Sequence, residues 1–244
     1  MFRFFRQIRK SLFASSNTRK YLLYALGEIL LVVMGILIAL QIDNWNENRK
    51  LQARQTQLLT DLRADLEETL EELKQGKEFN ALTLARYRTL MQAIDTDAPH
   101  SAEIDEASSF LPLFHVPRFS RTTYESIKSQ GLDLITNDSL KRQVTELYEN
   151  DFTYLKEDQA RMEWSIHTTT KPIFINRYLR WQDRQQPMVY PVDFEDMKAD
   201  DGFVNFLSEL IVVRAAGIRF YEQTISSIRA VLAAIDNELK KLRK

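Results

Sequence analysis

The chain carries few residues of the types that perform catalysis or bind metals. It has three histidines, His100, His115 and His167, and no cysteine. Only Glu163 and His167 stand four residues apart, a spacing that shares one helix face. A di-iron bundle needs two Glu-x-x-His pairs with further carboxylates, and a zinc protease needs His-Glu-x-x-His; neither pattern occurs. We therefore interpret Glu163 and His167 as a surface ion pair, and expect no metal site and no cofactor.

Other catalytic patterns are missing as well. The sequence has no phosphate-binding loop, no dinucleotide glycine pattern and no Gly-x-Ser-x-Gly motif. Without cysteine there is no disulfide and no thiol nucleophile. Neighbouring carboxylates occur at Glu67-Glu68, Glu71-Glu72 and Glu157-Asp158. Solvated faces of amphipathic helices explain such pairs, so we expect that the chain is not an enzyme.

Glu28 is the one ionisable residue in the apolar run 21–42. A carboxyl group at membrane depth is costly unless it is protonated, paired or able to reach water. Heptad counting places a stripe along one helix face: Glu28, Val32, Gly35 and Ala39. The small pair Gly35 and Ala39 permits close helix approach, so we predict that this stripe packs on another transmembrane helix, from a second copy or a partner. The alternative is that Glu28 reaches the inner headgroups.

An aromatic segment at 110–119, FLPLFHVPRF, is the second candidate site. Long loops in compact domains often bind ligands, so Phe110, Phe114, His115 and Phe119 form a possible binding loop. The alternative is that these apolar side chains cover one end of a helical bundle. The segment has few polar groups that converge, which favours the covering role. Whether a small molecule binds stays open.

The helix that must carry Glu28 is a membrane anchor. The run Tyr21–Ile42 holds 22 residues, and a helix of that length spans roughly 33 Å, enough to cross a bilayer core of about 30 Å. A cleaved signal peptide is the alternative, but its apolar region is shorter and ends in small residues, whereas this run ends at Leu40-Gln41. We therefore predict a retained signal-anchor, with Trp45 as an interfacial anchor just beyond it.

The distribution of charge predicts the orientation. Residues 1–20 contain six basic residues and no acid, which places the N-terminus in the cytoplasm and residues 43–244 in the periplasm of the cell inner membrane. Residues 2–13 have apolar side chains near one helix face, so residues 1–20 form a basic amphipathic leader or a disordered one. Without residues 1–20 the chain has 27 basic and 34 acidic residues, which gives no support to nucleic-acid binding.

The remainder is predicted to be helical. We expect a long helix about 43–94, a loop at 95–120 with room for one short turn, a short helix 122–130, a long helix 138–168, a short helix 172–183, a linker 184–201 and a long helix 202–243. Thr122 to Glu125 form a capping box, Gly131 ends the helix that follows, and Asn137 begins the next one. Thr168–Thr170 and Pro172 end that second long helix.

Apolar stripes predict which faces are buried. In the first long helix the stripe is Leu58, Leu59, Leu62, Leu66, Leu70, Leu73, Leu82, Leu84, Tyr87, Leu90, Met91 and Ile94, with Gly76 as its weak point. In the second it is Leu140, Val144, Leu147, Asp151 or Phe152, Leu155, Met162 and Ile166, where Asp151 is a polar intrusion. In the last it is Phe203, Phe206, Leu210, Val213, Gly217, Phe220, Thr224, Val231, Ile235 and Leu239.

The last stripe approximates the 3-4 spacing of a coiled coil over about 40 residues, or ~60 Å of helix. No strand-like alternation of apolar and polar residues persists. The predicted fold is therefore all-α: one N-terminal transmembrane helix, followed by an elongated antiparallel helical bundle with long helices.

Two stretches resemble a known family. They are GEILLVVMGILIALQIDNWNENRK at 27–50 and RTTYESIKSQGLDLITNDSLKRQVTELYE at 121–149. Together they resemble an uncharacterised family, a domain of unknown function, of single-pass membrane proteins from Bacteroidota. The resemblance implies a bacterial envelope protein and supplies no activity, cofactor or catalytic residue.

Two functions remain. The first is a membrane-anchored interaction or scaffold module of the envelope, whose partner is its own copy or another membrane protein. The second is a periplasmic ligand-sensing or regulatory domain, which would act through a membrane partner because residues 1–20 are too few for an output domain.

Overall fold

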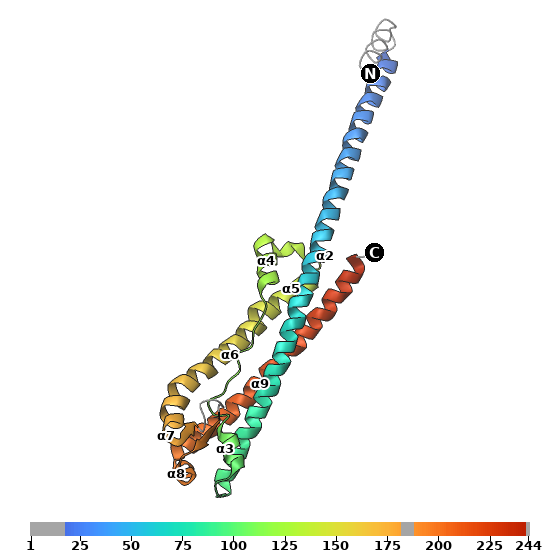
Figure 1. Ribbon diagram of the computed structural model, residues 1–244. Coiled ribbons are helices and arrows are strands. Elements are labelled where there is room, and N and C mark those ends of the chain that lie inside the picture. Colours follow the sequence, from blue (N-terminus) through green and yellow to red (C-terminus); the bar gives the residue numbers. More distant parts are fainter. Residues whose placement is uncertain (1–17, 182–187, 243–244) are drawn as a thin grey trace. The chain divides into compact units, whose positions relative to one another are not determined.

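The computed structural model describes residues 18–181 and 188–242 and is almost entirely helical (Figure 1). The predicted all-α class is therefore confirmed. The chain forms two compact units, Met1–Arg54 and Gln55–Lys244. The amphipathic helix expected at 2–13 lies outside the described residues.

The first helix, α2 (Thr18–Asp95), is 78 residues long and contains the apolar run. It is the one described helix that is long and apolar enough to cross a membrane, and none of its apolar window is buried. Leu31, for example, is 70% exposed. By its length and composition, this segment is suited to a bilayer rather than to the protein core.

Further along, α2 becomes a core helix of the second unit. Leu59, Leu62 and Leu66 are fully buried there. The last helix, α9 (Asp201–Leu242), runs alongside this part of α2 (Figure 1). Arg63 of α2 pairs with Asp236 of α9 at 2.7 Å, and Lys77 pairs with Glu222 at 3.7 Å. As the residue number increases along α2, the residue number of its partner on α9 decreases, so the two helices are antiparallel.

Two short helices follow α2: α3 (Ala102–Ser108) and α4 (Thr122–Gln130). The capping box predicted at the start of α4 is wrong, because its N-cap is Arg121 and no side chain caps it locally. Instead, the Thr123 N–H donates to the Asp65 carboxylate of α2 at 3.2 Å. Gly131 ends α4 with a φ of 110°, a conformation that favours glycine, as predicted.

A 3-10 turn, η1 (Leu132–Leu134), leads to α5 (Asp138–Glu146). Asn137 is the N-cap of α5, as predicted: its side chain accepts hydrogen bonds from the N–H groups of Ser139 and Leu140.

Two π-helical segments alternate with α-helix after α5. They are η2 (Leu147–Asp151), followed by α6 (Phe152–Ser165), and η3 (Ile166–Ile175). The predicted end of this helix near residue 168 is therefore wrong. In an α-helix the ring of Pro172 would meet the carbonyl of Thr168, whereas the wider π turn changes that register and the chain stays helical.

The short helix predicted at 172–183 and the linker predicted at 184–201 are also corrected. After η3 come α7 (Asn176–Tyr178), strand β1 (Leu179–Trp181), strand β2 (Val189–Pro191) and α8 (Phe194–Ala199). The strands pair antiparallel, with Leu179 opposite Pro191. Each strand has three residues, too few for a recognisable alternation. Residues 182–187 lie outside the described part of the chain.

The buried side chains of the second unit form two hydrophobic clusters. One joins α2, α4, α5, η2, α6 and the second half of α9 around Tyr148 and Phe152. The other joins α2, α3, the hairpin and the first half of α9 around Tyr87 and Phe203. Most predicted core residues lie in these clusters.

Two predicted core positions are wrong. Leu82 is 46% exposed and Phe220 is 37% exposed. Tyr221, the neighbour of Phe220, is fully buried instead. Arg214 is buried at 2% exposure, while Val213 is only partly buried. At these two positions of α9 the residue after the predicted one is the more buried, whereas the rest of the predicted stripe, from Phe203 to Leu239, is buried as expected.

Candidate functional site

The predicted transmembrane packing face lies on α2 within the first unit. Glu28 is half-buried, whereas Val32, Gly35 and Ala39 are exposed. A Cβ built on Gly35 meets no atom within 4 Å. The small-residue pair is therefore open to a neighbouring helix, and its packing role stays a prediction. Trp45 is 64% exposed, and the Arg49 guanidinium lies 5.7 Å from its ring centroid.

The predicted binding loop packs onto the bundle. Phe119 stacks on Phe152 with ring centroids 5.0 Å apart. Phe110 and Phe114 pack against the second cluster. These contacts agree with the covering role, and a binding role for the loop stays a prediction.

His115 packs at Gly76 of α2. A Cβ on Gly76 would lie 2.9 Å from His115 Nδ1 and 2.7 Å from Tyr221 Cε1, so this glycine permits both rings to approach the helix. Gly76 was predicted to be a weak point of the helix, but α2 is helical throughout. His115 Nε2 lies 3.6 Å from the Glu72 carboxylate. Burial lowers the pKa of His115, and Glu72 opposes this shift.

Arg214 forms a buried polar centre that the sequence reading missed. Its Nη1 donates to Asn80 Oδ1 of α2, and its Nη2 donates to Tyr87 Oη and to the Leu113 carbonyl, each at 3.4 Å. All three acceptors are uncharged, which is unusual for a buried guanidinium. The Nε atom is buried without a hydrogen-bond partner among the described residues. The hydrogen bonds of Arg214 thus connect α9 to α2 and to the loop that follows α3.

Further polar groups lie near this centre. Asp158 of α6 is 8% exposed, and its Oδ2 lies 3.3 Å from where a Gly217 Cβ would stand. Burial raises the pKa of Tyr221 above its ordinary value, and the Arg214 charge opposes the shift. A signal for Arg214 was available: with Leu210 and Gly217 it fits the 4-3 spacing of the stripe.

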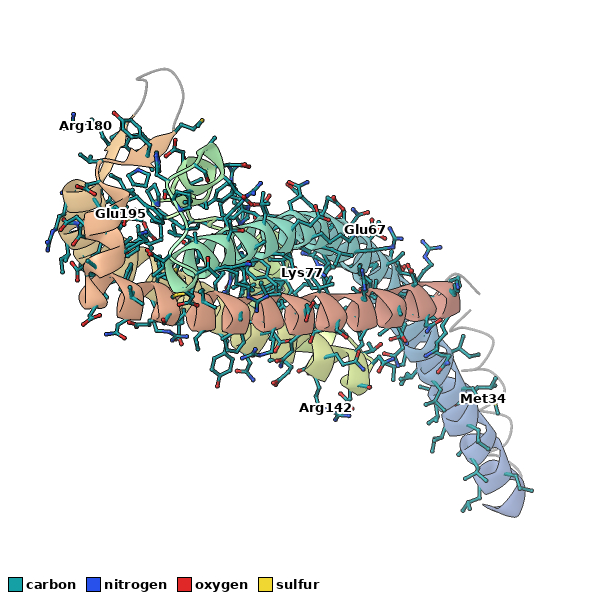
Figure 2. All side chains as sticks on the ribbon, turned by 90° about the horizontal axis from the view of Figure 1, so that it is seen from below. Met34, Glu67, Lys77, Arg142, Arg180 and Glu195 are labelled. Carbon is teal, nitrogen blue, oxygen red and sulfur yellow. The ribbon has the colours of Figure 1, made fainter. Side chains whose placement is uncertain are left out.

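An open groove lies between α5, η2 and α6 on one side and α9 on the other. We call it the η2 groove. Its first hollow, of about 340 Å³, is lined from α5 and η2 by Arg142, Gln143, Glu146, Leu147 and Asp151. From α9 it is lined by Ser227, Ala230 and Val231. Figure 2 shows the Arg142 side chain projecting from α5 at the outer edge of the bundle.

A second hollow, of about 180 Å³, continues the η2 groove toward α6. It is lined by Asp151, Tyr154, Leu155, Phe220, Gln223 and Thr224. Asp151, the polar intrusion of the predicted stripe, lines both hollows, while Phe152 takes the core position. The sequence signal for the groove was therefore this one carboxylate.

The described residues contain no group of three or more metal-ligating side chains placed to hold an ion. The η2 groove has an apolar floor with charged side chains at its edge.

Comparison with known protein families finds a match for this chain. A family described as "Family of unknown function (DUF6090)" matches residues 28–159. The chain belongs to this family. The match runs from Glu28 through the core part of α2 to the middle of α6, so it includes the α5–η2 wall of the groove. No curated protein and no solved structure matches the chain.

Proposed function

We propose that this DUF6090 protein is a single-pass, membrane-anchored interaction module that scaffolds other proteins of the bacterial envelope and acts by binding rather than by catalysis. The observation that carries this proposal is α2: one helix contains an uncovered apolar segment and also supplies core residues of the helical bundle. Such a chain holds a folded domain at a membrane. The η2 groove adds a surface on which a partner docks.

In this proposal the anchor lies in the inner membrane, with the N-terminus in the cytoplasm and residues 43–244 in the periplasm. The six basic residues within 1–20 support this orientation. The stripe of Glu28, Val32, Gly35 and Ala39 contacts a second transmembrane helix, because an acidic side chain in a bilayer usually faces protein.

Affinity capture of the full-length protein from membranes in mild detergent tests the function. We expect a stoichiometric membrane-protein partner, identified by mass spectrometry and by the mass of the complex. A homo-oligomer without any partner would contradict the scaffold role. A reporter fused after residue 244 would test the orientation.

The transmembrane contact has its own test. Glu28→Leu should reduce recovery of the partner or change the oligomeric state. Unchanged recovery and an unchanged oligomeric state would exclude a packing role for this face.

A further inference from the structure

The α9 side of the η2 groove is a regular helical strip. Phe220, Thr224, Ser227 and Val231 follow one another at intervals of four, three and four residues. The strip covers twelve residues, or about 16 Å along the helix axis, which is about three helical turns. A groove of this length between two antiparallel helices has the shape that accepts a further helix.

The side chains of the groove suit close helix approach at one end and aromatic contact at the other. Ser227 and Ala230 are small, so a backbone can come near α9 there. Tyr154 and Phe220 flank the second hollow and are 64% and 37% exposed. Large exposed aromatic side chains are enriched among the anchors of protein interfaces.

Asp151 gives the groove a chemical preference. It is half-buried on a π turn, where the two hollows meet. Its side chain makes no ion pair or hydrogen bond with any residue that the structure describes. A partner that covers the groove would remove water from this carboxylate, so the contact needs a cation on the partner to pair with it. The nearby Glu146 is also unpaired with described residues, and Arg142 is the single cation lining either hollow.

We infer that the η2 groove binds an amphipathic helix of a partner protein, whose apolar face of small residues lies on α9 and whose Lys or Arg side chain pairs with Asp151. At the first hollow, an acidic side chain of the same helix faces Arg142. This inference rests on the proposed interaction function, and it names the surface and the chemistry of the contact.

The first test uses two neighbouring serines as a matched pair. Ser227 lines the groove, whereas Ser226 is exposed beside it and lines neither hollow. A photo-activatable benzophenone amino acid is placed at either position in the full-length protein in its native membranes. We expect cross-linking to one partner segment from Ser227, at a yield several-fold above that from Ser226. The mapped segment should show an i, i+3, i+4, i+7 apolar pattern with a basic residue.

The second test removes the charge. Asp151→Asn should weaken partner binding by about tenfold, because the partner's cation loses its counter-ion. Asn150→Ala, at the exposed neighbouring position, is the control and should leave binding unchanged. Exchanging the charges, Asp151→Lys with the partner's basic residue changed to Asp, should restore binding. Equal thermal unfolding of the variants would show that the fold is intact.

The two proposals fail in different ways. If the wild-type protein captures no partner, the interaction function is wrong. If the complex forms but Asp151→Asn binds as tightly as wild type, or if Ser226 and Ser227 cross-link equally, the groove is not the binding surface. Cross-linking from Ser227 only to a second copy of this chain, or to a segment without helical periodicity, would also overturn the inference.

Discussion

At Gly76, two rings from different parts of the chain contact α2 where a side chain would otherwise stand. We expect Gly76→Ala to lower the free energy of unfolding, since overpacking costs about 1–3 kcal/mol and exceeds the roughly 1 kcal/mol by which alanine favours a helix. Denaturant unfolding followed by circular dichroism measures the change. The control is Gly27→Ala on the same helix, where the added carbon meets nothing within 4 Å. An unchanged midpoint for Gly76→Ala would show that Tyr221 and His115 move aside freely.

The Arg214 centre predicts a non-additive pair of substitutions. Asn80→Leu removes the acceptor of Arg214 Nη1 and leaves the buried guanidinium with one hydrogen bond fewer. We therefore expect the free energy of unfolding to fall by about 3 kcal/mol. Arg214→Met in the same chain removes that charge and should recover much of the loss. A double-mutant cycle of unfolding free energies measures the coupling. Additive effects would mean that the two side chains stabilise the fold independently.

His115 predicts a pH dependence. Burial lowers its pKa below the ordinary value of 6.5, so the folded state binds the proton less readily than the unfolded state. The free energy of unfolding is therefore highest above pH 6.5, where His115 is neutral in both states. It decreases as the pH falls below that value, because the unfolded state then binds the proton more readily. We expect the unfolding midpoint to drop between pH 7 and pH 5, and to drop less in His115→Gln. Parallel profiles for the two proteins would exclude His115 as the source.

At the scale of elements, one serine fastens the hairpin to α3. Ser109 Oγ accepts a hydrogen bond from the Val189 N–H at 3.0 Å and lies 2.9 Å from the Val189 carbonyl. Ser109→Ala should therefore speed amide hydrogen exchange in β2. It should also lower the free energy of unfolding by about 1–3 kcal/mol, because buried backbone groups of Val189 lose their hydrogen-bond partner. Ser108→Ala is the matched control: its hydroxyl is buried without a partner among the described residues, so we expect no loss.

The long helices were predictable because their apolar residues recur at helical spacing over many turns. Gly131 and Asn137 were predictable because each acts on the backbone next to it. The cap of α4 was not, since Asp65 lies 58 residues from Thr123 along the chain. The hairpin was missed for a related reason, because the Ser109 hydroxyl bonds to β2 from a distant part of the chain. The π segments were missed because no local sequence pattern predicts a π turn around Pro172. For the η2 groove, the sequence contained one signal, the polar Asp151 within an otherwise apolar stripe.

At the scale of the molecule, every buried side chain that the structure describes belongs to Gln55–Lys244. We expect a fragment of residues 43–244 to stay in solution, with helical circular dichroism and cooperative unfolding, because it retains this core. The full chain should remain in the membrane fraction after alkaline carbonate extraction. A full chain released by carbonate would contradict the anchor, and an aggregated fragment would show that the apolar segment is needed for folding.

The positions of the tryptophans have an optical consequence. The chain has three, Trp45, Trp164 and Trp181, and they are 64%, 67% and 52% exposed. Their emission in the native state is therefore that of indoles in contact with water, and it changes little when the core comes apart. The same placement makes two of them useful reporters. Trp45 should shift its emission to the blue when the anchor enters lipid, and Trp164, on the exposed face of α6, should respond when another molecule covers that face.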